Sequence, residues 1–222
     1  MPPLLEAEGL VLDREPAGER HLRLRLLSPT LGLVYALVRE SRPAGGNSSS
    51  TRKSTGAAQR PDVFDHAALQ LQPPGAGAAH ANVYFVSEYK VLRRHAGLGR
   101  NYAALSAAAA LAALIARNAA HFETCAPVFA LCRKALEALD QGAPPEVVRL
   151  KALFLLARAE GYAAKEHWLP TLPEADAALA LAILNRPAAE AAALVTRDAS
   201  RLPKLREAFE RWLGEHTDIE VK

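Results

Sequence analysis

The chain has 222 residues, of which 50% are hydrophobic and 23% are charged, and its formal net charge is +3. This composition is typical of a globular protein that buries an adequate core, and it excludes an intrinsically disordered chain. No apolar run approaches the ~20 residues of a membrane-spanning helix, and the first residues lack the basic-then-apolar order of a signal peptide. Two cysteines do not make a disulfide framework, so we expect a cytoplasmic protein with no membrane contact.

The positive charge is concentrated in the first half of the chain. Residues 1–100 hold 13 Lys and Arg against 9 Asp and Glu, a net of +4, whereas residues 101–222 hold 14 against 15, a net of −1. A nucleic-acid-facing module followed by a neutral module would give this asymmetry. Ordinary variation of a solvated surface gives it too, so charge alone does not decide between the two.

The first hundred residues contain short apolar runs, several of which alternate with polar residues as half-buried β-strands do. A first strand is predicted from Gly9 to Leu12, followed by a turn from Arg14 to Arg20. The clearest alternation covers residues 21–27, where leucines occupy one face and Arg23 and Arg25 the other. This second strand is therefore predicted to bury its leucines and to expose its arginines.

Three further strands are predicted, with one long connection among them. Residues 31–38 are apolar on both faces, and residues 41–61 are rich in Gly, Ser and Thr, a length of loop that is usually functional or disordered. Strands follow at 67–72 and 83–92. This arrangement is typical of a five-stranded, partly open barrel of the OB type. A five-stranded SH3-like barrel fits nearly as well, and periodicity does not separate the two.

After Gly99 the apolar residues take on a helical period. Asn101 is expected to cap a helix that runs to about Asn118. A second helix, from about Pro127 to Leu139, is expected to stop at Gly142, which suits the left-handed position after a helix.

Three more helices are predicted after these. Pro144-Pro145 should start the third, and the capping-box pattern at Thr171–Glu174 should open a fourth that ends at Pro187. Asp198 or Ser200 is expected to cap the last helix, whose apolar stripe consists of Leu202, Leu205, Phe209, Trp212 and Leu213. The predicted fold is therefore α+β, with an OB-fold-like five-stranded barrel at residues 1–96 and an all-helical domain at residues 97–222.

Several short motifs follow one another in a fixed order through both domains. In chain order they are Gly9–Leu12, Gly18-Glu19, Leu22–Leu27, Ser28-Pro29, Gly32, Leu33–Val38, Arg39 and Arg42, then Phe64–Leu71 and Val83–Leu92, then Pro145–Tyr162 with its closing Gly161-Tyr162, and finally Arg211–His216 and Ile219–Val221. In this order the motifs resemble those of the bacterial RecO family, over nearly the whole chain.

The resemblance implies a recombination mediator of DNA repair that is not an enzyme. Such a protein binds single- and double-stranded DNA through its barrel, anneals complementary strands, and docks on the acidic, apolar-ended tail of single-stranded DNA-binding protein. With a RecR-like partner it helps to load a RecA-type recombinase, which implies a cytoplasmic, nucleoid-associated role. The alternative is a protein–protein adaptor whose OB-like barrel no longer binds DNA.

The sequence departs from the family in two places. Many relatives carry extra, often cysteine-containing residues after the central helix, and in some these form a zinc-binding module. Here residues 163–171 are short and contain no cysteine, so neither that module nor any other metal or cofactor is expected. The loop at 41–60 is also longer and richer in Gly and Ser than in the family.

The candidate DNA-binding residues are those that an OB-type barrel uses, namely cations for the phosphates and aromatic rings for the bases. Tyr84, Phe85 and Tyr89 are candidates for stacking, although one face of their strand must belong to the core. For every cation the alternative is an ordinary solvated surface charge. The candidate phosphate contacts, expected to form one continuous track, are Arg14, Arg20, Arg23, Arg25, Arg39, Arg42, Arg52, Lys53, Arg60, Lys90, Arg93 and Arg94, with Arg100 after them.

The candidate residues for the partner's tail lie on the predicted third helix. An acidic, apolar-ended peptide needs a groove between helices with a cation beside it. Arg149 and Lys151 stand at positions that resemble basic residues of the family, with Arg158 behind them. The alternative for each is a charge on the exposed face of an amphipathic helix.

Catalytic and metal-binding motifs find no support in the sequence. There is no glycine-rich phosphate loop, no Gly-x-Ser-x-Gly elbow and no His-Glu-x-x-His. Cys125 and Cys132 share a helical face with His121, but no third and fourth ligand for a metal is nearby. The cysteines are therefore interpreted as buried thiols. A hydrolase or transferase with an unrecognised site stays as the enzymatic alternative.

Overall fold

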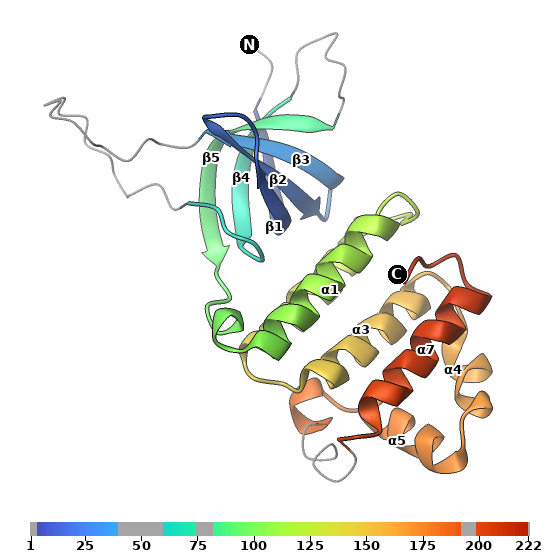
Figure 1. Cartoon of the computed structure of the whole chain (residues 1–222). Coiled ribbons are helices and arrows are strands. Elements are labelled where there is room, and N and C mark those ends of the chain that lie inside the picture. The colour runs from blue at the N-terminus through green and yellow to red at the C-terminus, as the bar shows by residue number, and fades with distance from the viewer. Residues whose placement is uncertain (1–3, 40–59, 74–81, 192–198, 222) are drawn as a thin grey trace, which may run out of the picture. The chain divides into compact units, whose positions relative to one another are not determined.

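The computed structural model describes residues 4–39, 60–73, 82–191 and 199–221. The chain divides into two compact units, residues 1–94 and residues 95–222, where the sequence suggested a boundary after residue 96. The first unit contains the strands and the second contains the helices (Figure 1).

The first unit is a closed barrel with the strand order β1-β2-β3-β5-β4 (Figure 1). The barrel closes through antiparallel pairing of β1 with β4, and β3 pairs with β5 in parallel. This topology confirms the α+β prediction and supports the OB-like barrel over the SH3-like alternative. The strands are β1 (Leu5–Pro16), β2 (His21–Ser28), β3 (Gly32–Arg39), β4 (His66–Gln72) and β5 (Val83–Arg93).

The barrel core is built from alternate residues of neighbouring strands. Leu22, Leu24 and Leu26 of β2 are buried, and the register places Leu24 beside the buried Ala36 of β3. Because successive side chains of a strand point to opposite faces, the arginines between these leucines point away from the core, as predicted.

The first strand is longer than predicted, and the predicted turn from Arg14 to Arg20 is wrong in its first half. Residues 13–16 still pair with β2, and the chain turns only after Pro16, where Gly18 takes a φ of +71°. Proline is tolerated at this position because it ends the strand. The end of this strand was not predicted because it consists of charged residues, Asp13, Arg14 and Glu15, none of which favours β structure.

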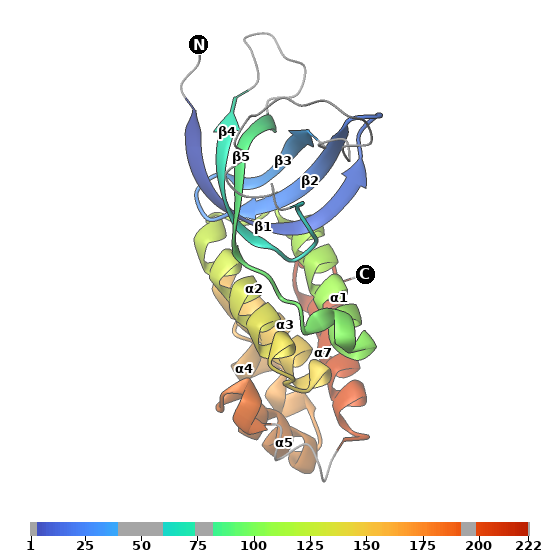
Figure 2. The ribbon, with the colours of Figure 1, turned by 90° about the vertical axis from the view of Figure 1, so that its left-hand side faces the viewer.

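The second unit is helical, and α1, α2 and α3 lie side by side in it (Figure 2). Short 3₁₀-helices cover Leu98–Arg100 and Leu169–Thr171. None of the helices in the described ranges is long and apolar enough to cross a membrane. The helices with described bounds are α1 (Tyr102–Asn118), α2 (Cys125–Asp140), α3 (Pro145–Ala159), α4 (Ala164–His167), α5 (Glu174–Leu184) and α7 (Leu202–His216).

Three of the predicted helix boundaries are confirmed. The side chain of Asn101 accepts hydrogen bonds from the backbone N–H groups of Ala103 and Ala104, which caps α1. Gly142 follows α2 with a φ of +86°, and α3 begins at Pro145. The predicted apolar stripe of the last helix is confirmed too, because all five of its residues are buried.

The predicted cap of the fourth helix is wrong, and that of the last helix is wrong at Ser200. Thr171 does not cap α5, because that helix begins after Pro173 with no side-chain cap and already ends at Leu184, while the hydroxyl of Thr171 donates to the carbonyl of Trp168 at 2.7 Å. Leu172 precedes Pro173 and is extended, with φ −87° and ψ 150°, as a residue before proline prefers, so α5 starts only after the proline. The last helix begins after Arg201 with no side-chain cap, so Ser200 does not cap it, and Asp198 lies outside the described residues.

A first prediction concerns Gly97, whose neighbourhood leaves no room for a side chain. A Cβ atom at this position would lie 2.6 Å from the backbone oxygen of Asp140, whereas one at Gly99 would meet nothing within 4 Å. We expect Gly97→Ala to lower the free energy of unfolding by about 1–3 kcal/mol. Gly99→Ala, the matched control, should change it by less than about 0.5 kcal/mol. Urea denaturation measures both, and equal effects would contradict the crowding at Gly97.

Candidate nucleic-acid interface

The outer face of β2 and β3 brings two arginines to one tyrosine. Arg25 is in register with Tyr35, and Arg23 lies two residues before Arg25 on the same face. The guanidinium carbons of Arg23 and Arg25 lie 5.5 and 5.6 Å from the centre of the Tyr35 ring, within the range of a cation–π interaction. We call Arg23, Arg25 and Tyr35 the arginine–tyrosine cluster.

The two arginines of this cluster differ in their remaining contacts. Arg23 donates through Nε and Nη2 to the same carboxylate oxygen of Glu15, at 2.6 and 2.5 Å. The Nε of Arg25 is buried and has no hydrogen-bond partner among the described residues.

An exposed aromatic ring continues the same face on the far side of β3. Phe85 of β5 is in register with Leu37 of β3 and is 49% exposed. The other two rings predicted to stack on bases, Tyr84 and Tyr89, instead pack against the barrel core. Phe85 is therefore the exposed ring that this face offers to a base, whereas Tyr35 is half-buried and lies under the two arginines.

Tyr35 was missed by the sequence analysis because its strand is apolar on both faces. A signal for it was present, since the tight turn at residues 29–31 pairs Arg25 with Tyr35 across the hairpin. If the pairing of β2 with β3 is known, the alternation of β2 can be carried across the turn, and it places the odd-numbered residues of β3 on the outer face. The sequence alone does not give that pairing.

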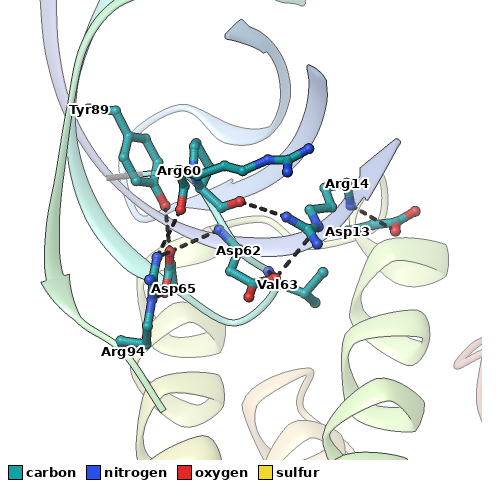
Figure 3. Close-up of polar contacts among 9 residues, drawn as sticks. Asp13, Arg14, Arg60, Asp62, Val63, Asp65, Tyr89 and Arg94 are labelled. Atoms are coloured by element: carbon teal, nitrogen blue, oxygen red, sulfur yellow. Dashed lines mark hydrogen bonds and ion pairs between the residues drawn. The ribbon is translucent and has the colours of Figure 1, made fainter. Parts of the chain in front are cut away.

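A second group of cations surrounds two carboxylates at another part of the barrel (Figure 3). Asp65 is only 1% exposed and accepts from Arg94 through Nε at 2.8 Å and Nη2 at 2.6 Å, from the hydroxyl of Tyr89 at 3.2 Å, and from the backbone N–H of Asp62 at 2.9 Å. The hydrogen bond with Asp65 raises the pKa of Arg94. These contacts tie the segment before β4 to the end of β5.

Arg14 and Arg60 belong to this second group. Arg14 donates to the carbonyl of Pro61 at 3.0 Å and lies 3.5 Å from a carboxylate oxygen of Asp62. The carbonyl of Arg60 accepts from Arg94 at 2.9 Å. Arg14 is in register with the buried Leu24, so it stands on the opposite face of the sheet from Arg23 and Arg25. The cations predicted to form one continuous track therefore fall into two groups at different parts of the barrel.

The remaining candidate phosphate contacts are placed as follows. Arg20, Arg39 and Lys90 are exposed, and Arg93 is half-buried. Arg39 is in register with His21 and stands on the same outer face as the arginine–tyrosine cluster. Arg42, Arg52 and Lys53 lie outside the described residues.

In the helical unit, two of the three predicted tail-binding residues are engaged within the protein. The ammonium group of Lys151 donates to the carbonyls of Ile183, Leu184 and Arg186 at 2.9, 3.0 and 2.6 Å, and burial lowers its pKa. It thereby caps the C-terminal end of α5, where backbone carbonyls lack partners. Arg149 pairs with Glu210 at 3.1 Å.

Arg158 is exposed and lines a hollow of about 260 Å³. The apolar part of the hollow comes from Phe154, Leu155, Leu181 and Leu184, and the exposed Lys165 and Glu166 line it as well. A concave apolar surface with exposed cations at its border suits an acidic peptide with an apolar end.

The two cysteines do not form a metal site with other described residues. Cys132 is buried, and desolvation raises its pKa to about 12. Cys125 is half-buried, and burial raises its pKa as well. Within the described ranges no group of three or more His, Cys, Asp or Glu residues could hold a metal ion.

No family model matches this sequence, and no curated protein matches it. The fold itself defines the class of protein: an OB-like barrel that carries an arginine–tyrosine cluster, followed by a helical unit. Membership of the RecO family stays a prediction from the order of the sequence motifs.

A second prediction concerns Tyr89, whose pKa is raised by burial and by the neighbouring Asp65. A tyrosine that holds its proton more tightly in the folded state contributes stability that is present below its ordinary pKa of about 10 and is lost as the pH rises beyond it. Between about pH 8 and 11, the wild type should therefore lose about 1 kcal/mol more free energy of unfolding than Tyr89→Phe. Urea denaturation at both pH values measures this. Tyr102→Phe, at an exposed ring, is the control and should behave as the wild type.

Proposed function

We propose that this protein is a DNA-binding recombination mediator of DNA repair that uses the outer face of its barrel. The observation that carries the proposal is the arginine–tyrosine cluster on an OB-like barrel. Single strands are bound by proteins that combine cations for the backbone with aromatic rings for the bases. The order of RecO-like motifs through both units supports the same function independently of the geometry.

The mechanism that follows from this proposal is electrostatic and needs no nucleotide hydrolysis. Arg23 and Arg25 neutralise the phosphates of one strand and release their counterions, which lowers the repulsion that a complementary strand meets as it approaches. Arg20 and Arg39, exposed near the same end of β2 and β3, extend the contact with the backbone. The protein then acts in the cytoplasm, on the nucleoid, with a RecR-like partner and a RecA-type recombinase.

The salt dependence of binding tests this function. For a single strand, the slope of log K against log salt falls by about 0.7 for each phosphate contact that is lost. The variant Arg23→Gln/Arg25→Gln should therefore bind a fluorescent oligothymidylate more weakly, with a slope flatter by about 1.4. Fluorescence anisotropy between about 50 and 200 mM salt measures both quantities.

The matched control for this test is Arg133→Gln/Lys134→Gln, which removes two exposed cations from α2. This variant should keep the affinity and the slope of the wild type. A wild type whose binding does not respond to salt, or an equal loss in both double variants, would overturn the proposed interface and favour the adaptor function.

The hollow beside Arg158 supports docking of an acidic, apolar-ended tail such as that of single-stranded DNA-binding protein. Its leucines offer an apolar surface, and the exposed Arg158 and Lys165 offer partners for carboxylates. Lys151 lines the hollow with its charged group already bound to backbone carbonyls, whereas Arg149 pairs with Glu210 and lies outside the hollow.

A charge reversal at the hollow tests the docking. Arg158→Glu/Lys165→Glu should weaken binding of a synthetic acidic peptide with an apolar C-terminal residue at least about tenfold, because charge-assisted hydrogen bonds are lost and carboxylates repel. Anisotropy of the labelled peptide measures the affinity. Arg133→Glu/Lys134→Glu supplies the same change of charge away from the hollow, and an equal loss there would contradict a specific site.

A further inference from the structure

The chemical character of the outward-facing side chains changes from β1 to β5. Backbone register aligns two rows of side chains across four neighbouring strands. The first row is Glu15, Arg23, Leu37 and Phe85, and the second is Asp13, Arg25, Tyr35 and Val83. In these two rows carboxylates lie on β1, cations on β2, and aromatic or aliphatic side chains on β3 and β5, whereas the next outward residue of β3 is the cation Arg39.

One row of cations between these two borders matches one nucleic-acid backbone. Neighbouring strands lie about 4.8 Å apart, so Phe85 lies roughly 10 Å from the arginines of β2, within reach of a base whose phosphate sits on Arg23. On the other side, Asp13 and Glu15 repel phosphate. A strand held along β2 must therefore turn its bases toward β3 and β5.

A duplex meets this face less well. Its second backbone lies across a groove of about 6 or 12 Å from the first. On one side that backbone falls on the carboxylates of β1, and on the other side it falls on the uncharged Leu37 and Phe85, with the cation Arg39 two residues beyond Leu37 at the end of β3. The paired bases of a duplex are also stacked inside it, so Phe85 gains no partner.

Glu15 competes with a phosphate for Arg23. Its carboxylate occupies the fork of Arg23 that a phosphate would take, and both side chains are about half exposed, 46% for Glu15 and 47% for Arg23. Ion pairs between exposed side chains contribute little to stability, so a phosphate on a flexible single strand can replace Glu15. The second backbone of a duplex, placed over β1, would be repelled both by the displaced carboxylate of Glu15 and by Asp13.

We propose, on the basis of the function proposed above, that Asp13 and Glu15 are specificity determinants that make this face select a single strand over a duplex. The single strand lies with its phosphates on Arg23 and Arg25, which Tyr35 supports from below, and with a base on Phe85. The carboxylates of β1 exclude a second backbone.

The experiment compares the affinities of the full chain for a labelled oligothymidylate and for a labelled duplex of equal length, at one low salt concentration. The wild type should prefer the single strand. In Asp13→Asn/Glu15→Gln the affinity for the duplex should rise more than that for the single strand, and the preference should fall about fivefold or more, since each carboxylate at contact distance opposes a phosphate. Glu88→Gln, at an exposed acid in register with Gln70 of β4, should leave the preference unchanged.

A second variant tests the other border of the face. Phe85→Ala should weaken binding of the single strand about fivefold or more, because base stacking on the ring is lost, and should leave the duplex affinity and the salt dependence unchanged. Equal changes for both nucleic acids in both variants, or a wild type that prefers duplex, overturn the selectivity. A wild type that binds neither nucleic acid overturns the proposed function itself.

Discussion

The inward packing of the leucines of β2 is the constraint on which the rest of the barrel depends. Leu22, Leu24 and Leu26 fill the core, and because the side-chain period of a strand is two, a slip of one residue would turn Arg23 and Arg25 inward. The cost of burying two guanidinium groups therefore fixes the register of β2 against both of its neighbours. Once that register is set, Glu15 and Tyr35 stand on either side of the arginines. The core and the candidate interface are two consequences of the same alternation.

This dependence explains how much of the fold the sequence could predict. The second strand and the capped start of α1 each follow from local rules, alternation in one case and a side-chain oxygen before a helix in the other, and both are confirmed. The first strand was predicted too short because its last residues are stabilised by pairing with β2, not by their own propensity. The helical start at Thr171 was predicted wrongly because Leu172 stands before Pro173 and is therefore extended, so the capping-box pattern cannot continue into a helix there.

The candidate site was predicted in part for the same reason. The exposure of Arg23 and Arg25 could be read from their own strand, whereas Tyr35 and Phe85 join them only through the pairing of β2 with β3 and of β3 with β5. The contacts of Arg94 could not be read at all, because Asp65 lies 29 residues away in the sequence. A count of basic residues treats such an arginine as equal to the others, although its charge is already committed to the fold.

The burial of the acidic partner separates these two kinds of arginine. Asp65 is 1% exposed, so releasing Arg94 to a phosphate would leave a carboxylate in the interior without its counter-charge, which is strongly unfavourable. Glu15 is 46% exposed and is rehydrated at once when Arg23 leaves it, so the exchange of a carboxylate for a phosphate costs little there. Two ion pairs of similar length on one barrel therefore have different roles. The Arg94–Asp65 pair stabilises the pairing of β4 with β5, whereas a ligand can replace Glu15 on Arg23. Exposure of the acid, more than the number of cations, decides where this barrel can accept a nucleic-acid backbone.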